Sequence, residues 1–582
     1  MTQTAVHSLK IAFAQLNPVV GDIAGNAGKA LDAHASAKSL GADLIVFPEL
    51  FLNGYPPEDL VLKPAFQDAT RVALEKLAAD TQDGPAILIG TIWREDGKVY
   101  NAVALLDGGR IETVRLKYDL PNYGVFDEKR VFAQGPMPGP INVRGVRIGV
   151  PICEDIWSAD VIETLAETGA ELLVSPNGSP FDWPKPDIRM NVAVARVTEN
   201  RLPLAYVNQV GGQDELVFDG ASFVLNADCK LAVQLPAWRE AIALTHWSRA
   251  NGGWRCEHGE VAAIEEGVAA AYQACMLGLR DYVEKNGFPG VVLGLSGGID
   301  SALVAAICAD ALGPDKVHAI MLPSKFTSDD SLTDAAACAN ALGLRYDRVS
   351  IEPAVSALNW SLKDLFEGTR PGITEENLQS RVRGTILMAI SNKFGGMVVT
   401  TGNKSEMSVG YATLYGDMNG GFNPIKDLYK LEVYALARWR NAHVPSGGLG
   451  ATGEVIPERI ITKAPTAELR ANQTDQDSLP PYEQLDDILR CLVENEMPLR
   501  EVVARGHDLD TVRKVERLLN LAEYKRRQAA PGVKISARNF GRDRRYPITN
   551  RFRDSLDAAP QAATAAAKRH LVKPSTDTGG DG

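Results

Sequence analysis

Residues 294–301 read GLSGGIDS and stand between an apolar run, VVL, and the helical pattern ALVAAICADAL. A glycine-rich turn between a buried strand and a helix is typical of phosphate binding, because its backbone N–H groups and the helix N-terminus attract anions. The lysine of the common phosphate loop, G-x-x-x-x-G-K-[ST], is missing here. Asp300 falls inside this anion cradle, and a Mg²⁺ ion bridging its carboxylate to phosphate oxygens would explain an acidic side chain there. On the glycines alone, an ordinary strand-to-helix turn capped by a serine is an equal alternative.

Three residues of the first half have the types needed for acyl transfer. Cys153 ends an apolar strand in GVPICEDIW, Glu49 ends another in LIVFPELFLNGYPPEDL, and Lys117 follows a strand in RLKYDLPNYGVFDEKR. A cysteine nucleophile needs a base, and the oxyanion it creates needs a positive charge or N–H groups. Glutamate, lysine and cysteine supply these parts without a histidine. Taken singly, each residue also has an ordinary alternative: inert packing for the cysteine, a turn cap for the glutamate and a solvated side chain for the lysine.

The elements that must position these residues follow an α/β pattern. In the first half, short apolar runs that predict buried strands alternate with helical segments, and SFVLNADCKLAVQL adds a hairpin. The predicted strands of this half are KIAFAQL, ADLIVFPEL, AILIGTIW, NAVALLD, VRIGVPIC, AELLVSP and LAYVNQVG. In a second series, GVVLGLS, KVHAIMLPS, RYDRVSI and GMVVTTG alternate with helices. This alternation predicts a parallel, doubly wound sheet with its site at the strand ends.

Length sets the expected domain organisation. A chain of 582 residues is too long for one ordinary core, so two or more domains are expected. The polar string HWSRANGGWRCEHGE at 246–260 interrupts the pattern and is typical of an interdomain linker. We therefore expect a first domain over 1–245, a linker over 246–265, a second domain over 266–556 and a disordered tail over 557–582.

Composition argues against several classes of protein. The formal net charge of -12 disfavours nucleic acid as the main partner. The chain opens without a charged and then apolar segment, and no run reaches about 18 apolar residues, so neither a signal peptide nor a membrane span is expected. The seven cysteines are scattered without a C-x-x-C pair, which fits a reducing compartment. We expect a cytoplasmic protein.

The loop at 294–301 carries a family resemblance. S-G-G-x-D-S after a buried strand is similar to the pyrophosphate loop of ATP pyrophosphatases, which cleave ATP between its α and β phosphates and adenylate a substrate. The strings MLPSKFTSDDSLTDA, ENLQSRVRGTILM, TTGNKSEMSVGYATLYGDMNGGFNPIKDLYK and FGRDRRYPITNRF make residues 294–550 resemble NAD synthetases. The resemblance implies ATP as co-substrate, Mg²⁺ as cofactor and a Rossmann-like, ATP-pyrophosphatase-type fold for the second domain.

The same resemblance assigns roles to individual residues. It implies that ATP is bound by Gly294, Leu295, Ser296, Gly297, Gly298, Ile299, Asp300, Ser301, Thr401 and Lys430, and deamido-NAD by Asn377, Arg381, Glu406 and Lys525. Asp300 and Glu406 would hold the metal ion. Cations suit a site that must offset ATP and a dinucleotide pyrophosphate, although runs such as QSRVR and KRR also occur on solvated helix faces. Relatives that use free ammonia carry a lysine where this chain has Leu414, so that lysine's role is not transferred.

The first half, over about 8–235, resembles the carbon–nitrogen hydrolase (nitrilase) family, with F-P-E, L-x-K and C-E-D in family order. That likeness implies an αββα sandwich. It also implies Glu49 as general base, Lys117 as oxyanion stabiliser, Cys153 as the nucleophile that forms a glutamyl thioester and Glu128 as the residue that orients the lysine. Tyr123, Ser179 and Lys185 would bind glutamine. Some relatives have arginine in place of this last lysine, so a bidentate grip on the substrate carboxylate is not implied.

Together the two halves resemble the glutamine-dependent NAD synthetases. The resemblance implies that glutamine is hydrolysed in the first half, and that ammonia passes internally to attack adenylated deamido-NAD, giving NAD, AMP, pyrophosphate and glutamate. It also implies a homo-oligomer, at least a dimer through the second domain. One alternative is another glutamine-dependent ATP pyrophosphatase, making GMP or asparagine, which the strings TLYGDMNGGFNP and FGRDRRYP disfavour. The other is a catalytically silent nucleotide-binding protein, which the presence of Cys153, Asp300 and Glu406 disfavours.

Overall fold

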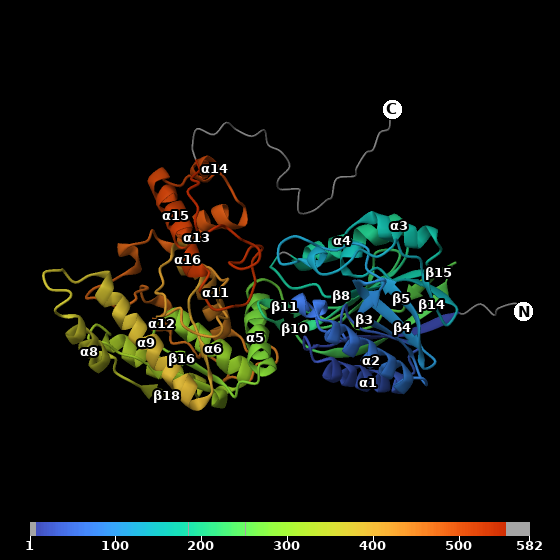
Figure 1. The fold of residues 1–582 in the computed structure, drawn as a ribbon, viewed down its shortest axis with the longest axis horizontal. Coiled ribbons are helices and arrows are strands. Elements are labelled where there is room, and N and C mark those ends of the chain that lie inside the picture. Colours follow the sequence, from blue (N-terminus) through green and yellow to red (C-terminus); the bar gives the residue numbers. More distant parts are fainter. Residues whose placement is uncertain (1–6, 184, 251, 555–582) are drawn as a thin grey trace, which may run out of the picture.

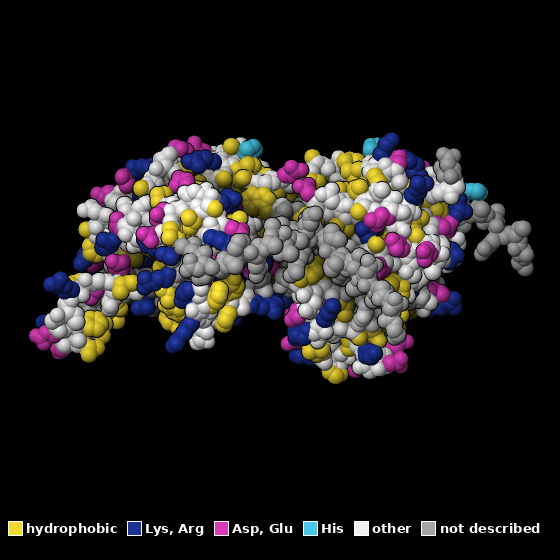
Figure 2. All heavy atoms as spheres, turned by 90° about the horizontal axis from the view of Figure 1, so that it is seen from above, with side chains coloured by type: hydrophobic (Ala, Val, Ile, Leu, Met, Phe, Trp, Pro, Cys, Tyr) yellow, Lys and Arg dark blue, Asp and Glu magenta, His cyan; other side chains and the backbone are white. Residues whose placement is uncertain are grey.

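The computed structural model describes residues 7–183, 185–250 and 252–554, so the predicted tail lies outside the described residues. Figure 1 shows two lobes, one formed by the first half of the chain and one by the second. On the face seen in Figure 2, basic and acidic side chains are interspersed over both lobes. In the described part of the chain, no helix is long and apolar enough to cross a membrane.

The first half contains two stacked sheets flanked by helices. The first sheet has the order β15 (Gly253–Cys256), β14 (Ala241–Ala250), β1 (Ser8–Gln15), β2 (Leu44–Val46), β3 (Ala86–Glu95), β4 (Lys98–Asp107) and β5 (Arg110–Leu116). The second has the order β13 (Leu231–Gln234), β12 (Phe223–Leu225), β9 (Leu204–Asn208), β8 (Leu172–Asn177), β7 (Val146–Gly149) and β6 (Ile141–Val143). The helices are α1 (Ile23–Ser39), α2 (Pro64–Asp80), α3 (Ala159–Glu167) and α4 (Lys185–Asn200).

Side-chain alternation along β1 explains this layering. Ile11 and Phe13 belong to the core between the two sheets, where Val174 of β8 faces them. Ala12 and Ala14 point the other way and belong to the core beneath α1 and α2. Successive side chains of a strand face opposite sides of the sheet, so each strand contributes to two layers. A third core joins α3 and α4 to the second sheet, and the predicted αββα sandwich is confirmed.

The predicted linker over 246–265 is wrong for its first part. β14 pairs antiparallel with β1 from Ser248 to Ala241, and β15 pairs with β14 at the edge of the same sheet. Trp247, Trp254 and Cys256 are buried, while charged and glycine residues between them face solvent. A strand with one buried face has a polar residue at every second position, so the polar residues here predict a linker although the segment forms two strands.

The second half is built on four parallel strands in the order β18 (Arg345–Arg348), β17 (Val317–Met321), β16 (Val291–Gly294) and β19 (Met397–Val399). Helices α5 (Gly267–Lys285), α6 (Ile299–Leu312), α7 (Asp329–Leu342) and α11 (Lys430–Ala442) contribute to the core on one face, and α8 (Glu352–Leu362) and α9 (Ile373–Phe394) to the core on the other. The predicted doubly wound sheet is confirmed. Its strand order reverses beside β16, so the loops after β16 and β19 border a crevice.

A helical layer covers the C-terminal part of the second half. It consists of α10 (Lys404–Val409), α13 (Tyr482–Leu489), α14 (Leu499–Ala504), α15 (Leu509–Leu521) and α16 (Glu523–Arg526), with one π-helical turn, Arg490–Glu494, after α13, whereas α12 (Glu458–Thr462) packs on α6 and α11. Leu485 and Leu489 pack there against Val512 and Val515 of α15. Figure 1 shows α13 to α15 at the top of this lobe.

The two halves share one core at their seam. The hairpin of β10 (Val210–Gln213) and β11 (Leu216–Asp219) leaves the first half and packs on α5, and Val210 and Val217 belong to the same core as α5 and α6. Asp281 of α5 accepts hydrogen bonds from the Gly212 N–H at 2.7 Å and from Asn17 Nδ2 at 2.6 Å. The seam is therefore a packed and hydrogen-bonded interface.

Candidate active sites

Three strand ends of the first half carry the predicted acyl-transfer residues. Glu49 follows β2, Lys117 follows β5 and Cys153 follows β7. Glu49 reaches the centre because β3 has Gly90 beside it. A Cβ on that glycine would lie 2.1 Å from the backbone nitrogen of Leu50. The turn that carries Glu49 can therefore pack against β3 only because residue 90 has no side chain.

Lys117 is the hub of a buried ion-pair cluster. Its Nζ donates to Glu49 Oε1 at 2.7 Å and to both carboxylate oxygens of Glu128 at 2.9 Å. Lys117 and Glu49 have no exposed surface, and Glu128 is 5% exposed. Asn101 Nδ2 donates to Glu49 at 2.7 Å, and the Tyr55 hydroxyl donates to Glu128 at 2.9 Å. One ammonium between two buried carboxylates leaves the cluster with a net charge of about −1. The hydrogen bonds from Asn101 and Tyr55 reduce the free-energy cost of burying that charge.

Cys153 stands next to this cluster in a strained conformation. It begins a short 3-10 helix, Cys153–Ile156, with a φ of 46°, which is unusual for a residue with a side chain. Burial raises the pKa of its thiol well above the usual range, the Glu49 carboxylate raises it further, and the Lys117 ammonium lowers it. The thiol is therefore protonated at neutral pH and needs a base to become a nucleophile.

The two acids after the cysteine hold the nucleophile turn in place. Asp155 accepts hydrogen bonds from the Ile152 N–H at 2.9 Å and from the Asp119 N–H at 2.7 Å, which ties the turn to the segment after Lys117. Burial raises the pKa of Asp155 to about 7. Glu154 accepts from the hydroxyl of Tyr123 at 2.9 Å. The C-E-D string thus has a positioning role that follows from geometry.

The predicted glutamine-binding residues are placed unequally. Tyr123 is half exposed above the turn at Cys153. Ser179 is buried, and the N–H of the adjacent Gly178 donates to Glu49 Oε2 at 2.9 Å, which places Ser179 next to the base of the nucleophile. Lys185 is the first residue of α4, and its side chain lies outside the described part of the structure. Two of the three residues therefore lie beside the nucleophile.

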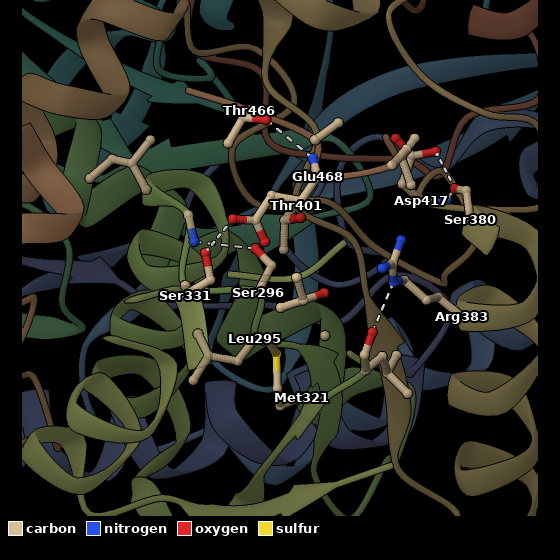
Figure 3. Close-up of a pocket in the computed structure, with 18 of the residues that line it drawn as sticks. Leu295, Ser296, Met321, Ser331, Ser380, Arg383, Thr401, Asp417, Thr466 and Glu468 are labelled. Carbon is tan, nitrogen blue, oxygen red and sulfur yellow. Dashed lines mark hydrogen bonds between the residues drawn. The ribbon is translucent and has the colours of Figure 1, made fainter. Parts of the chain in front are cut away.

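The glycine-rich loop of the second half borders a cavity of about 270 Å³ at the end of β16. Gly294 to Ile299 and Thr401 line this cavity, and Figure 3 shows its side chains converging from several loops. Gly297 has a φ of 78°, and a Cβ there would lie 2.4 Å from the carbonyl oxygen of Ser331. Ser296 and Ser301 are hydrogen-bonded through their hydroxyls at 3.0 Å, which closes the turn. The side chains of Leu295 and Ile299 are buried, so only the backbone groups of these two residues are available to form hydrogen bonds with a ligand.

The two predicted metal ligands meet at one lysine. Lys430, the first residue of α11, donates from Nζ to Asp300 Oδ2 at 2.6 Å and to Glu406 Oε1 at 3.1 Å. Asn403 Nδ2 donates to Asp300 Oδ1 at 2.8 Å. Burial raises the pKa of the Glu406 carboxyl, the Lys430 ammonium opposes that rise, and Asp300 adds to it. Among the described residues, no group of three or more His, Cys, Asp or Glu could hold a metal ion alone. Carboxylate oxygens are the kind of ligand that Mg²⁺ prefers, and here the Lys430 ammonium lies between the two carboxylates.

The predicted dinucleotide contacts gather around one loop, 410–414. Lys525 donates from Nζ to the carbonyl oxygens of Gly410 at 2.8 Å and Ala412 at 2.7 Å. Arg381 donates from Nε to the Leu414 carbonyl at 3.2 Å. Asn377 accepts from the hydroxyl of Thr413, which lines the cavity of the phosphate loop, at 2.9 Å. The structure thus brings these three residues together beside the cavity, although none of them lines it directly.

Other polar residues of the cavity escaped the sequence analysis. Arg383 donates from Nε to the Leu322 carbonyl at 3.0 Å, and burial lowers the pKa of its guanidinium. It stands two positions after Arg381 in QSRVR, so the spacing of the pair was the available signal. Glu468 accepts from the hydroxyls of Ser328 at 2.7 Å and Ser331 at 2.8 Å in the loop that covers the cavity, where no residue pattern marked it.

Both folds and both sites have counterparts in known families. Residues 10–252 match the carbon–nitrogen hydrolase family, and residues 271–529 match the NAD synthase family. The class is thus a fusion of a carbon–nitrogen hydrolase with an NAD synthase. The glutamine-dependent NAD(+) synthetase of Rhodobacter capsulatus is 53% identical over 94% of this chain and 99% of its own, and that of Xanthomonas campestris is 47% identical over 95% and 100%.

A solved structure gives the same result. The glutamine-dependent NAD+ synthetase of Acinetobacter baumannii, solved with adenosine diphosphate, has a TM-score of 0.74 and 42% identity, covering 93% of this chain and 99% of its own. The chain belongs to the glutamine-dependent NAD(+) synthetase family. It is an enzyme of the glutamine-hydrolysing ligase class.

Proposed function

We propose that this enzyme converts deamido-NAD to NAD, using ATP and glutamine and releasing AMP, pyrophosphate and glutamate, as the last step of NAD synthesis. The observation that carries the proposal is the presence, in one chain, of the Lys117 cluster beside a buried cysteine and of the glycine-rich cavity at the end of β16. Each site alone leaves the other without a role. A single reaction in which the second site consumes ammonia made by the first site gives both of them a role.

In the first half, Glu49 takes the proton of the Cys153 thiol as sulfur attacks the side-chain carbonyl of glutamine. The Lys117 ammonium stabilises the tetrahedral oxyanion, and Glu128 keeps that lysine charged and oriented. Glu49 returns the proton to the leaving nitrogen, which departs as ammonia and leaves a thioester. Water, deprotonated by Glu49, then hydrolyses the thioester to glutamate. Tyr123, Ser179 and Lys185 position the substrate in this scheme.

In the second half, the backbone N–H groups of Gly294 to Ser301 and the N-terminus of α6 bind the ATP phosphates. Asp300 and Glu406 would hold Mg²⁺, which would supply positive charge to offset that of the phosphates. Lys430 lies between these carboxylates. Burial lowers the pKa of its ammonium, but Asp300 and Glu406 raise it more, so Lys430 stays charged and contacts the phosphates. Thr401 binds ATP, while Asn377, Arg381, Glu406 and Lys525 hold deamido-NAD. Ammonia then displaces AMP from the adenylated nicotinate.

Assembly and location complete the proposal. Free ammonia is mostly protonated at neutral pH, so it passes between the sites inside the protein. A homo-oligomer through the second half is favoured by Trp360, Leu365 and Ile373, large apolar side chains that are 79%, 77% and 73% exposed around α8 and α9. Light scattering that finds a monomer would contradict this part. All seven cysteines are unpaired, which supports a cytoplasmic location.

The test is AMP formation measured across a panel of candidate acids, namely the carboxylic acids deamido-NAD and aspartate and the purine nucleotide xanthosine monophosphate, with glutamine as nitrogen donor. We expect AMP, pyrophosphate and NAD in equal amounts with deamido-NAD, and no AMP with aspartate or xanthosine monophosphate. A matched control replaces glutamine with ammonium chloride, which should still give NAD. AMP formed with one of the other acids would refute the substrate assignment.

A further inference from the structure

A second cavity, of about 260 Å³, lies at the seam between the two halves and shares no lining residue with the cavity of the phosphate loop. Glu215, from the turn between β10 and β11, lines it from the first half. The second half contributes the remaining charged residues, which are Lys426, Glu523, Arg526, Arg527 and Arg544. The proposed reaction uses none of these six side chains.

Positive charge exceeds negative charge in this cavity. The Glu523 carboxylate pairs with three guanidiniums: Arg526 at 2.7 Å, Arg527 at 3.2 Å and Arg544 at 3.1 Å. Lys426 pairs with Glu215 at 3.1 Å. The lining therefore holds four cations and two carboxylates, a net charge of about +2. Such an excess is costly where the groups are buried, and Lys426, Arg526 and Arg544 are only 4–6% exposed.

The arginines are fixed in place but not fully satisfied. Arg526 lies over the ring of Phe540 at 4.6 Å, and Arg544 lies over the ring of Tyr546 at 3.6 Å. The Nε of Arg526 is buried and has no hydrogen-bond partner among the described residues. Burial lowers the pKa of Arg526 to about 10, and the neighbouring Arg544 and Arg527 lower it further against the opposing effect of Glu523. Three guanidiniums share the one carboxylate of Glu523, so this fixed and mutually repelling set of cations favours an anion.

We propose that this seam cavity binds a phosphate-class anion, held by Arg526, Arg527, Arg544 and Lys426. A phosphate carries close to the −2 charge that the lining lacks, and its oxygens match the fork of a guanidinium. A water molecule occupies about 30 Å³ in the liquid, and the cavity volume is several times larger. The cavity can therefore hold a phosphate group together with part of the molecule that carries it. The four cations all come from the second half, and Glu215 of the first half lines the same cavity, so the anion binds at the seam.

The test is equilibrium dialysis with radiolabelled inorganic phosphate, at constant ionic strength, while a non-hydrolysable ATP analogue saturates the phosphate loop. We expect one phosphate per chain in the wild-type enzyme and at least a tenfold loss of affinity in Arg527→Gln and Arg544→Gln. Arg545→Gln is the matched control, because that exposed arginine is adjacent in sequence and does not line the cavity. Unlabelled pyrophosphate and AMP, added separately, distinguish which phosphate compound competes best.

Two outcomes would overturn the proposal. One is the absence of bound phosphate once the ATP analogue is present. The other is equal binding by Arg527→Gln and Arg545→Gln, which would mean an adventitious ion only. Should Arg544→Gln fail to fold, Arg527→Gln decides the test, because the side chain of Arg527 is 48% exposed and its loss leaves the packing intact.

Discussion

Replacing Lys117 with methionine tests the buried cluster of the first half most directly. Methionine keeps much of the side-chain volume and removes the ammonium, so the packing around Lys117 changes little. The substitution eliminates the three hydrogen bonds of 2.7–2.9 Å from Nζ and leaves the Glu49 and Glu128 carboxylates facing each other without a cation. All three groups are almost fully buried, so solvent cannot screen the repulsion.

The expected magnitudes follow from this burial. Breaking a buried ion pair by removing one partner costs about 3–5 kcal/mol, since the remaining charge is uncompensated. The loss of an oxyanion donor lowers the rate about 10²–10³-fold. Adding Glu128→Gln to Lys117→Met removes the second charge, so the double variant should recover much of the stability. It should not recover glutamine hydrolysis, because the oxyanion still lacks its cation.

The assays separate stability from chemistry. Urea unfolding of the single and double variants measures the stability difference, and glutamate release measures the first site. NAD formation from ammonium chloride reports whether the second half is still folded and active. The reasoning fails if Lys117→Met hydrolyses glutamine at near the wild-type rate, or if the double variant is as unstable as the single one.

Four further outcomes are expected. Cys153→Ala should abolish NAD formation from glutamine and leave formation from ammonia largely intact, because only thioester chemistry is lost; continued use of glutamine would remove Cys153 as nucleophile. Asp300→Asn should abolish NAD formation from either nitrogen source, and normal synthesis from ammonia would take Asp300 out of the phosphate and metal site. The rate of Cys153 alkylation, followed by mass spectrometry, should still increase with pH at pH 9, because burial raises the thiol pKa. Lys117→Met should shift this pH–rate curve to higher pH, because the lysine lowers the thiol pKa. A shift of the curve to lower pH would contradict the electrostatics. Glutamate release should rise about 5–150-fold when ATP and deamido-NAD saturate the second site, as a coupling of about 1–3 kcal/mol provides, and equal rates would mean independent sites.

The sequence predicted the buried central strands and missed the two strands β14 and β15. GVVLGLS and KVHAIMLPS read as continuous apolar runs and became β16 and β17, the central strands of the parallel sheet. β14 and β15 lie at the edge of the first sheet, where half of the side chains meet solvent, so their polar residues were interpreted as a linker. Apolar runs identify strands only where both faces are covered.

The site residues could be predicted where neighbouring residues in the sequence form one functional turn. They were harder to predict where residues distant in the sequence come together. C-E-D and S-G-G-x-D-S could be recognised because neighbouring residues build each turn. The contacts of Asn101 with Glu49 and of Lys430 with Asp300 join residues 52 and 130 positions apart, and no spacing rule predicts such pairs. Family resemblance supplied part of this information, and the fold supplied the rest.

The shared core at the seam changes what the fusion of two enzymes means physically. A flexible linker would let each half move independently, and ammonia leaving the first site would meet water and become protonated. Instead, Asp281 of α5 accepts from Gly212 of the first half, and Lys285 donates from Nζ to the Pro18 and Gly212 carbonyls at 3.0 and 2.8 Å. These contacts fix the hairpin of β10 and β11 to the helix that also packs on α6, which begins in the phosphate loop. A movement of that loop on ATP binding therefore displaces side chains that are packed as far as the first half. Packed interfaces transmit such a displacement because they have few voids to absorb it.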